Sequence, residues 1–306
     1  MVKNYVAVDL GGTTIKFAII DELGKIIKKW HIKTDVSDNG KNIPQDIVDT
    51  IKAEANDVEV SGVGIGVPGP ISADGRSVVR AVNLGWGLTP LSDFIQKQLQ
   101  VPVLLVNDAN AAALGEMWQG AAQGKENIVF VTLGTGVGGG IILNKRIING
   151  VHSSGGEIGH IPVESDEHRV CGCGNINCLE TFSSANGMVK TMQKILADNG
   201  EERGDFTTVD IFEWLKKGDE LAQQALDITV DKLGRAIASI MNTVDAEEVV
   251  IGGGLSAAGA PLLLPLKDVI DKHIFPEIRG NYHLKQATLG NDAGAFGAIA
   301  GFVVDD

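Results

Sequence analysis

The chain has 306 residues, of which 44% are hydrophobic, and its 26 basic and 39 acidic side chains give a formal net charge of −13. This length allows two domains, because a single hydrophobic core usually stops growing at about 250–300 residues. Such a net charge repels nucleic acids and anionic membranes, so neither is an expected partner. An anionic ligand would instead have to be held by backbone amides and metal ions.

Only Met1-Val2-Lys3-Asn4 precede the first predicted strand, which is too short a segment for an export signal. We therefore expect a cytoplasmic protein. The most apolar stretch, residues 249–266, is interrupted by glycines and prolines. That pattern is typical of a strand, a turn and a helix rather than of a membrane span.

Apolar periodicity and turn residues predict strands that alternate with helices in both halves of the chain. In the first half, the predicted strands are 5–9, 16–21, 26–34, 60–67 and 101–106, and the predicted helices are 44–55, 90–98 and 109–119. In the second half, a hairpin over 127–143 precedes helices at 185–197, 208–217 and 219–244, a strand at 248–251 and a helix over 292–302. This order indicates an α/β fold.

The predicted elements also suggest two domains, with the last helix returning to the first one. We expect a small N-terminal α/β lobe of residues 1–116 plus 290–306, and a large C-terminal α/β lobe of residues 117–289. A cleft between two such lobes is the expected place for a substrate.

The run Asp9-Leu10-Gly11-Gly12-Thr13-Thr14-Ile15-Lys16 lies between two apolar strands. A glycine turn lets backbone N–H groups approach an anion, and Asp9 supplies a carboxylate for a metal ion. The run therefore predicts a site for phosphate and its metal ion. Taken alone, it is equally compatible with an ordinary Gly-Gly hairpin.

An approximate internal repeat supports the phosphate interpretation. Residues 128–136 can be laid over residues 5–13, with Leu133-Gly134 on Leu10-Gly11, and a second strand follows each copy. The repeat predicts a duplicated nucleotide clamp. Thr132 stands where the first copy has Asp9, so only the first copy is expected to hold the metal ion.

Asn107-Asp108 lies where a predicted strand ends and a helix begins. Side chains at this edge of an α/β sheet usually face the ligand, so Asp108 is the candidate general base. The alternative is a helix N-cap, for which Asn and Asp are preferred. Both roles are compatible if Asn107 caps the helix and Asp108 faces the cleft.

The chain has three cysteines, and all of them lie in the run Cys171-Gly172-Cys173-Gly174-Asn175-Ile176-Asn177-Cys178. In a cytoplasmic protein, such clustered thiols favour a metal site over disulfides. His160 would complete a tetrahedral Cys₃His shell, which leaves no open position and therefore indicates structural zinc. His168 and His152 are weaker candidates for the fourth ligand.

Further candidate ligand-binding residues lie beside the metal-binding run and in glycine-rich loops. Glu157 and Glu180 flank the predicted metal ligands, and carboxylates fixed in this way suggest recognition of a sugar. The segments 64–70 and Asn83-Leu84-Gly85-Trp86 have the composition of ligand loops, and Gly252-Gly253-Gly254 could lie against an adenine or ribose. There is neither a G-x-x-x-x-G-K-[ST] motif nor a protein-kinase catalytic set.

These motifs, taken in order, closely resemble the ROK family of repressors, open reading frames and sugar kinases, and within it the bacterial glucokinases. The resemblance runs essentially end to end. It rests on Asp9-x-Gly11-Gly12-Thr13-x-x-Lys16, Asn83-Leu84-Gly85-Trp86, Asn107-Asp108-Ala109-Asn110-Ala111-Ala112, Gly134-Thr135-Gly136-x-Gly138-Gly139-Gly140, Gly156-Glu157-Ile158-Gly159-His160 and the cysteine run that ends before Glu180.

The resemblance implies a two-lobe actin-like, ribonuclease-H-like ATPase fold with a duplicated mixed β-sheet core, and transfer of the ATP γ-phosphoryl group to the 6-hydroxyl of glucose. Asp108 would be the base, and the sugar would contact Gly69, Asn83, Asn107, Asp108, Glu157, His160 and Glu180. ATP and Mg²⁺ would be held by Asp9, Gly11, Gly12, Thr13, Lys16, Thr135, Gly136, Gly253 and Gly254. Structural Zn²⁺ would bind His160, Cys171, Cys173 and Cys178.

The chain departs from the family pattern at one position: Asn177 stands where the family usually has Gly before its last cysteine. Asn tolerates a left-handed backbone, so the turn should still form. Fructose, mannose, N-acetylglucosamine and N-acetylmannosamine are alternative sugars, and polyphosphate is an alternative donor. A homodimer is expected from the family.

Two other classes of protein share features of this sequence. A sugar-sensing repressor of the same family would need a DNA-binding segment ahead of the first hairpin, and we expect none here. An actin-like ATPase acting as a chaperone or filament would not account for carboxylates beside a metal site.

Overall fold

The computed structural model describes residues 2–304 and divides into two compact units. Unit 1 comprises Met1–Gly124, Lys145–Gly155 and Leu289–Asp306, and unit 2 comprises Lys125–Asn144 and Gly156–Thr288. This division groups residues 117–124, 145–155 and 289 with unit 1, whereas the division expected from the sequence assigned them to the second lobe.

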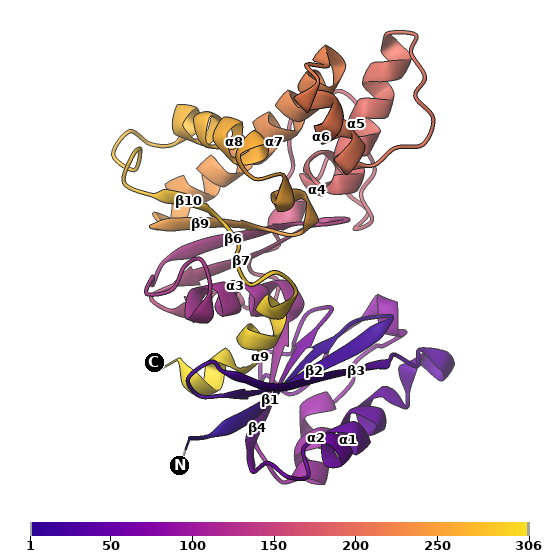
Figure 1. Cartoon of the computed structure of the whole chain (residues 1–306), viewed down its shortest axis with the longest axis vertical. Helices are drawn as coiled ribbons and strands as arrows, with labels where there is room; N and C mark the ends of the chain where they lie inside the picture. The colour runs from indigo at the N-terminus through magenta and orange to yellow at the C-terminus, as the bar shows by residue number, and fades with distance from the viewer. Residues whose placement is uncertain (1, 305–306) are drawn as a thin grey trace. The chain divides into compact units, whose positions relative to one another are not determined.

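Unit 1 contains a five-stranded mixed sheet in the order β3-β2-β1-β4-β5 (Figure 1). The strands are β1 (Asn4–Leu10), β2 (Thr14–Asp21), β3 (Ile26–Lys33), β4 (Val60–Val67) and β5 (Val103–Asn107). Strands β1, β2 and β3 form an antiparallel meander, and β4 and β5 continue the sheet in parallel with β1.

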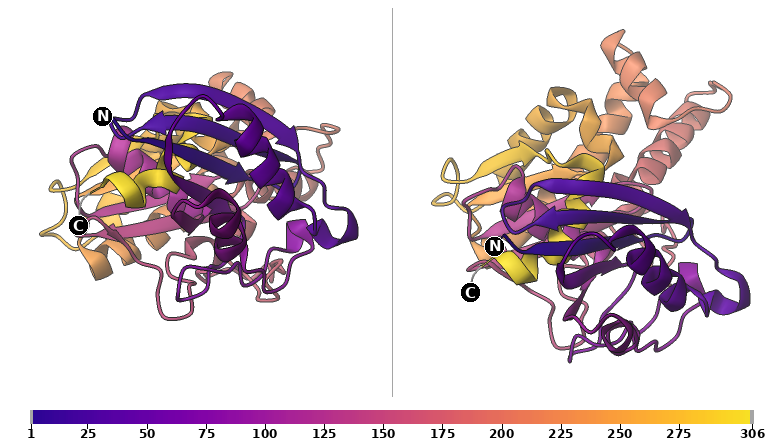
Figure 2. Two further views of the ribbon diagram at one scale, coloured as in Figure 1. Left: turned by 90° about the horizontal axis from the view of Figure 1, so that it is seen from below. Right: turned by 60° about the horizontal axis from the view of Figure 1, so that its bottom comes forward.

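Helices cover both faces of this sheet. Successive residues of β1 point to opposite faces, and the buried residues on each face are apolar, so each face needs a covering layer. Val6, Val8 and Leu10 pack with α1 (Ile43–Glu54) and α2 (Leu91–Leu99), whereas Tyr5 and Ala7 pack with the C-terminal helix α9 (Ala293–Val303). Both views of Figure 2 show α9, in yellow, beside the indigo strands of this sheet. Helix α3 (Asp108–Gln119) packs on α9, and two short 3₁₀ turns, η1 (Ser37–Gly40) and η2 (Val82–Leu84), complete the first part of unit 1.

The second sheet repeats the topology of the first, with the order β10-β9-β6-β7-β8. Its strands are β6 (Ile128–Leu133), β7 (Val137–Leu143), β8 (Arg146–Ile147), β9 (Glu248–Gly252) and β10 (His283–Gln286). Strand β6 pairs antiparallel with β7 across a glycine turn and parallel with β9, as β1 does with β2 and β4. The internal duplication predicted from the sequence is therefore present in the fold.

The helices of unit 2 pack with its sheet around one hydrophobic core, and they lie above it in Figure 1. They are α4 (Glu180–Ser183), α5 (Ala185–Asp198), α6 (Thr208–Lys216), α7 (Glu220–Val244) and α8 (Ala260–His273). Short 3₁₀ turns are η3 (Ile158–His160), η4 (Gly254–Ala258) and, in unit 1, η5 (Gly290–Asp292).

The α/β class and all strands and helices predicted from the sequence are confirmed. The observed ends differ from the predicted ones by no more than two residues. Strand β10 was missed because His283-Leu284-Lys285-Gln286 has a single apolar residue and lies at the edge of the sheet. Within residues 2–304, no helix combines the length and apolar composition needed to cross a bilayer.

Candidate active site and metal centre

The first glycine turn is a tight hairpin held from one side by Thr34. The Gly11 N–H donates to Thr14 O at 3.1 Å, the Thr34 hydroxyl donates to Gly11 O at 2.6 Å, and the Thr34 N–H donates to Thr13 O at 3.0 Å. Asp9 and Lys16 are cross-strand partners at the base of this turn, with Nζ 3.2 Å from the Asp9 carboxylate. The turn is thus braced, and the Asp9 carboxylate at the end of the central strand β1 stays 30% exposed.

Asn83 lies beside this turn, because a Cβ added to Gly12 would be 3.3 Å from the Asn83 Cβ. The loop that carries Asn83 is fixed by Trp86, whose indole N–H donates to Gly40 O at 3.1 Å. The structure therefore brings the predicted phosphate turn and one predicted sugar residue together within unit 1.

Asn107 caps α3, so the capping role suggested by the sequence belongs to this residue. Its Oδ1 accepts from the N–H groups of Ala109 and Asn110 at 3.0 and 3.2 Å, and its Nδ2 donates to Gly69 O at 3.3 Å. Asp108 is the exposed first residue of α3, and one of its carboxylate oxygens accepts from Ala109 N–H at 2.8 Å. Gly69, Asn107 and Asp108 thus form a second group of predicted site residues in unit 1.

The second glycine turn lies between β6 and β7 in unit 2. The Gly134 N–H donates to Gly136 O at 3.0 Å, and Thr135 is exposed at the tip. Gly253 has a φ of 80° and approaches this turn so closely that an added Cβ would be 2.5 Å from Leu133 O. The predicted nucleotide residues Thr135, Gly136 and Gly253 are therefore neighbours.

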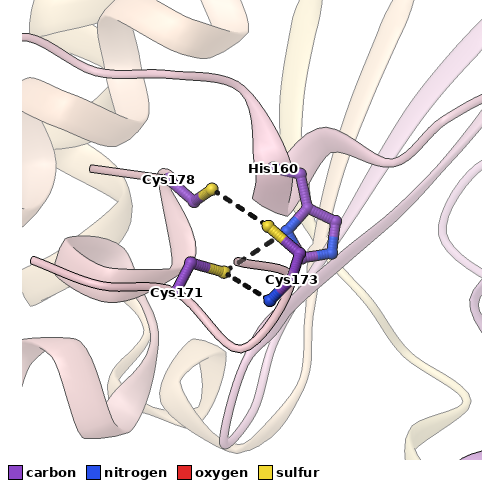
Figure 3. Close-up of side chains that lie close together, drawn as sticks. All are labelled: His160, Cys171, Cys173 and Cys178. Atoms are coloured by element: carbon purple, nitrogen blue, oxygen red, sulfur yellow. Dashed lines mark hydrogen bonds between the residues drawn. The ribbon is translucent and has the colours of Figure 1, made fainter. Parts of the chain in front are cut away.

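His160, Cys171, Cys173 and Cys178 form the predicted cluster, with one ligand atom from each lying within 4.8 Å of the others. The His160 Nδ1 lies 3.6 Å from the Cys171 Sγ, and the Cys173 and Cys178 sulfurs are 3.6 Å apart (Figure 3). In the described part of the chain, neither His168 nor His152 belongs to this cluster. The set of donor atoms is the one that a tetrahedral metal site requires.

The thiols of the cluster differ in environment. Burial raises the pKa of the Cys171 and Cys178 thiols, whereas a hydrogen bond from the Asn175 N–H lowers the pKa of the exposed Cys173 thiol. Because metals bind thiolates, loading this site would release protons. Asn177 adopts a φ of 53°, so the left-handed turn expected before the last cysteine is present.

Two predicted sugar carboxylates adjoin the metal cluster. The Cys171 thiol donates to Glu180 Oε1 at 2.9 Å, and Glu157 Oε2 lies 3.9 Å from His160 Nε2. The segments carrying these residues are paired, because Leu179 N–H donates to Ile161 O at 2.8 Å. Unit 2 therefore brings Glu180 to Glu157 and His160, which lie about 20 residues earlier in the chain.

The second glycine turn also lies next to this group of residues. A Cβ added to Gly136 would be 2.6 Å from Glu180 Oε2. Predicted nucleotide and sugar residues thus meet within unit 2.

Arg169 is a largely buried residue of this region that the sequence analysis did not single out. Its side chain is only 11% exposed and contacts the helix that begins at Glu180. The only signal in the sequence was an arginine two positions before the first cysteine, which a pattern search does not distinguish from a surface charge.

Two sheets of one topology, each with a glycine turn between its central antiparallel strands, define the duplicated actin-like ATPase fold. The ROK family profile matches residues 5–303, and the chain belongs to this family.

Known relatives include enzymes and regulators. The chain is 40% identical to a glucokinase of Halalkalibacterium halodurans over 306 residues, covering 96% of this chain and 93% of that protein. It is 29% identical to a xylose repressor of Caldicellulosiruptor bescii, covering 99% of this chain and 79% of that protein. The crystal structure of a ROK family glucokinase from Streptomyces griseus in complex with glucose and AMPPNP has a TM-score of 0.76 and 30% identity, covering 96% of this chain and 97% of that one.

Proposed function

We propose that this protein is an ATP-dependent hexose kinase that phosphorylates glucose on its 6-hydroxyl. One observation carries the proposal: Glu157, His160 and Glu180 gather beside a Cys₃His cluster, next to the glycine turn of β6 and β7. The glucokinase relatives, one of which was crystallised with glucose and AMPPNP, support the same activity.

Asp108 is proposed as the general base. It takes the proton of the 6-hydroxyl as the sugar oxygen bonds to the γ-phosphorus and the bond to the leaving ADP oxygen breaks. A positioned base contributes about 10²–10⁴-fold to the rate. The cap made by Asn107 fixes the first turn of α3 and with it the backbone of Asp108.

The remaining roles are also proposals, which the family resemblance and the grouping of residues within each unit support. Glu157, Glu180 and His160 would bind sugar hydroxyls together with Gly69, Asn83 and Asn107. The two glycine turns would surround the nucleotide through Gly11, Gly12, Thr13, Thr135, Gly136, Gly253 and Gly254, with Lys16 beside them. Mg²⁺ would neutralise charge on the phosphates, and we propose that the Asp9 carboxylate, which is 30% exposed, helps to hold it.

The Cys₃His cluster is proposed to hold structural zinc. Three thiolates and one imidazole match the closed tetrahedral coordination that zinc adopts, which leaves no position for a catalytic water. With His160 Nδ1 turned to the thiols, its Nε2 is the nitrogen left to face Glu157 and a sugar.

The choice of glucose over fructose, mannose or an N-acetylated hexosamine, and of ATP over polyphosphate, belongs to the proposal. The cytoplasmic location and the homodimer stay predictions from the sequence. A second candidate is a sugar-sensing regulator without kinase activity, which the xylose repressor relative favours. Specific binding of operator DNA without sugar phosphorylation would support it.

The test is an ADP-release assay over a panel of hexoses, with ATP or polyphosphate as donor, on wild-type protein and Asp108→Asn. We expect the highest kcat/KM with glucose and ATP. The variant should keep glucose affinity near that of the wild type while kcat falls by about 10²–10⁴-fold. An enzyme that no hexose stimulates, or a variant with near-normal kcat, would contradict the proposal.

A further inference from the structure

Arg169 lies just before the cysteine run, in a short antiparallel ribbon in which residues 169–170 pair with residues 176–177. The Arg169 N–H donates to Asn177 Oδ1 at 2.8 Å, and the Asn177 N–H donates to Arg169 O at 2.7 Å. The Asn177 Nδ2 donates to Ser165 O at 2.7 Å, so its side chain ties the ribbon to the segment that follows His160. Glycine at this position would leave both side-chain bonds unmade.

The guanidinium of Arg169 points from this ribbon to the helices that follow the cysteines. Its Nη1 lies 2.8 Å from Thr181 O in α4, and 3.3 and 3.0 Å from Gly187 O and Thr191 Oγ1 in α5. Its plane lies over the Phe182 ring, 4.1 Å from the ring centroid. One side chain thus holds the two residues that directly follow Glu180.

The charge of this arginine is compensated where it lies. Its Nε donates to Glu167 Oε2 at 2.9 Å, and its Nη2 lies 2.9 Å from the same oxygen. The Arg169 side chain is 11% exposed, and a largely buried charge with an ion partner and several acceptors resists displacement, because a lost partner would leave a polar group poorly solvated. The planar fork of arginine can reach these acceptors together, which the ammonium group of lysine cannot do.

Glu180 is therefore fixed from two sides. On its N-terminal side, Cys178 belongs to the metal cluster; on its C-terminal side, Thr181 and Phe182 contact Arg169. On the cluster side, Cys178 O accepts from the Thr181 N–H and hydroxyl at 2.9 and 2.7 Å, and the Cys171 thiol donates to the Glu180 carboxylate. The contacts of Arg169 with Thr181 O and the Phe182 ring restrain the same turn without involving any of the predicted metal ligands. Orientation of that turn decides where the Glu180 carboxylate points.

We propose that Arg169 is a positioning residue, which orients α4 and thereby the Glu180 carboxylate for the sugar, by contacts that do not depend on the metal. This inference rests on the proposed hexose kinase activity. It assigns to Arg169 no contact with substrate.

The experiment compares Arg169→Met and Arg169→Lys with wild type and with Arg203→Met. Arg203 is a matched control in unit 2, since it also stacks on an aromatic ring, Trp214 at 4.8 Å, and pairs with carboxylates, but none of its contacts involves the segment around Glu180. Hexose KM, ATP KM, kcat, melting temperature and zinc per chain are measured for each protein, below the melting temperature of the least stable variant.

For Arg169→Met we expect hexose KM to rise by about tenfold or more, the factor that corresponds to one displaced charged hydrogen bond. ATP KM should change by less than about twofold, and zinc should stay at the wild-type ratio. Arg169→Lys, which keeps the charge over Phe182 and loses the fork, should have an intermediate hexose KM. Arg203→Met should lower the melting temperature and leave hexose KM unchanged.

Wild-type hexose KM in both Arg169 variants would overturn the inference, as would a rise in KM that is matched by loss of zinc. An equal rise in Arg203→Met would also overturn it, by showing a general effect of destabilisation. If Arg169→Met does not fold, Arg169→Lys decides the question by the same readings. A wild-type protein that phosphorylates no hexose would refute the proposed function instead, so the two failures are distinct.

Discussion

Replacing Gly136 with Ala should weaken sugar binding with little effect on stability. The added Cβ would lie 2.6 Å from Glu180 Oε2, whereas ordinary contact begins at 3.4 Å, so the carboxylate must retreat by roughly 0.8 Å. The obstructed atom is the end of a flexible side chain, and the backbone of Gly136 does not have a positive φ. The fold can therefore accept the methyl group by moving Glu180.

The cost appears when a sugar binds. A hydrogen bond of about 2.8 Å that lengthens by this amount leaves the range of hydrogen-bond geometry. A bond to a charged group contributes about 1.5–3 kcal/mol, so we expect the glucose dissociation constant to rise by roughly 10- to 150-fold. Calorimetry or fluorescence titration with glucose measures the constant, and differential scanning calorimetry measures the melting temperature.

Gly134→Ala is the matched control, because a Cβ at Gly134, in the same turn, meets no atom within 4 Å. The control should bind glucose like the wild type. Glucose affinity within about twofold of wild type in Gly136→Ala, with Gly134→Ala unchanged, would refute the placement of Glu180 at the sugar.

Three further predictions concern the metal, the core and the pH dependence of stability. Cys173→Ser should lower bound zinc, measured by mass spectrometry, and raise glucose KM; retained zinc with unchanged KM would contradict the role of the cluster. Gly297→Ala places a Cβ 1.6 Å from Ala111 O, so α3 and α9 must separate. Urea unfolding should show that the free energy of unfolding falls by about 3 kcal/mol or more. In the control variant Gly301→Ala the added Cβ faces only the Leu104 side chain, so the free energy of unfolding should fall by less. Hydrogen bonds from the Glu126 and Asn127 N–H groups, together with Lys125, lower the pKa of Glu247 below its usual 4.5. The contribution of the Glu247 carboxylate to the free energy of unfolding is therefore full above pH 4.5, and it is lost as the pH falls through the folded-state pKa. The difference in urea midpoint between wild type and Glu247→Gln should accordingly shrink from pH 7 to pH 3, and a constant difference would be inconsistent with this linkage.

The elements of the fold could be predicted from local pattern, because burial imposes its period on the sequence. The uninterrupted small and apolar run of β4 gave the correct bounds, Val60–Val67, and the buried residues Ile47, Val48 and Ile51 marked one face of α1. Strand β10 has no such pattern. It is a strand because its backbone pairs with β9, which is a property of the assembled sheet.

The candidate site could be predicted where its chemistry demands certain residue types in a fixed arrangement. Three cysteines in one short run indicate a metal site by their spacing alone, and of the three histidines considered as fourth ligand it is His160 that lies in the cluster. The two possible roles of Asn107 and Asp108 could not be separated in the same way, because capping depends on which side chain turns back to the helix.

The sequence by itself determined the α/β class, the duplicated hairpins, the members of the Cys₃His cluster and the family, since each of these depends on residue types and on spacing along the chain. Only the tertiary structure decided that Gly136 adjoins Glu180, that Gly253 crosses the turn at Leu133, and that Arg169 supports α4. These contacts join segments that come together through pairing of distant backbone, such as Leu179 with Ile161. No local pattern records them, because one arginine or glycine has the same neighbours in sequence whether or not the fold brings a carboxylate beside it.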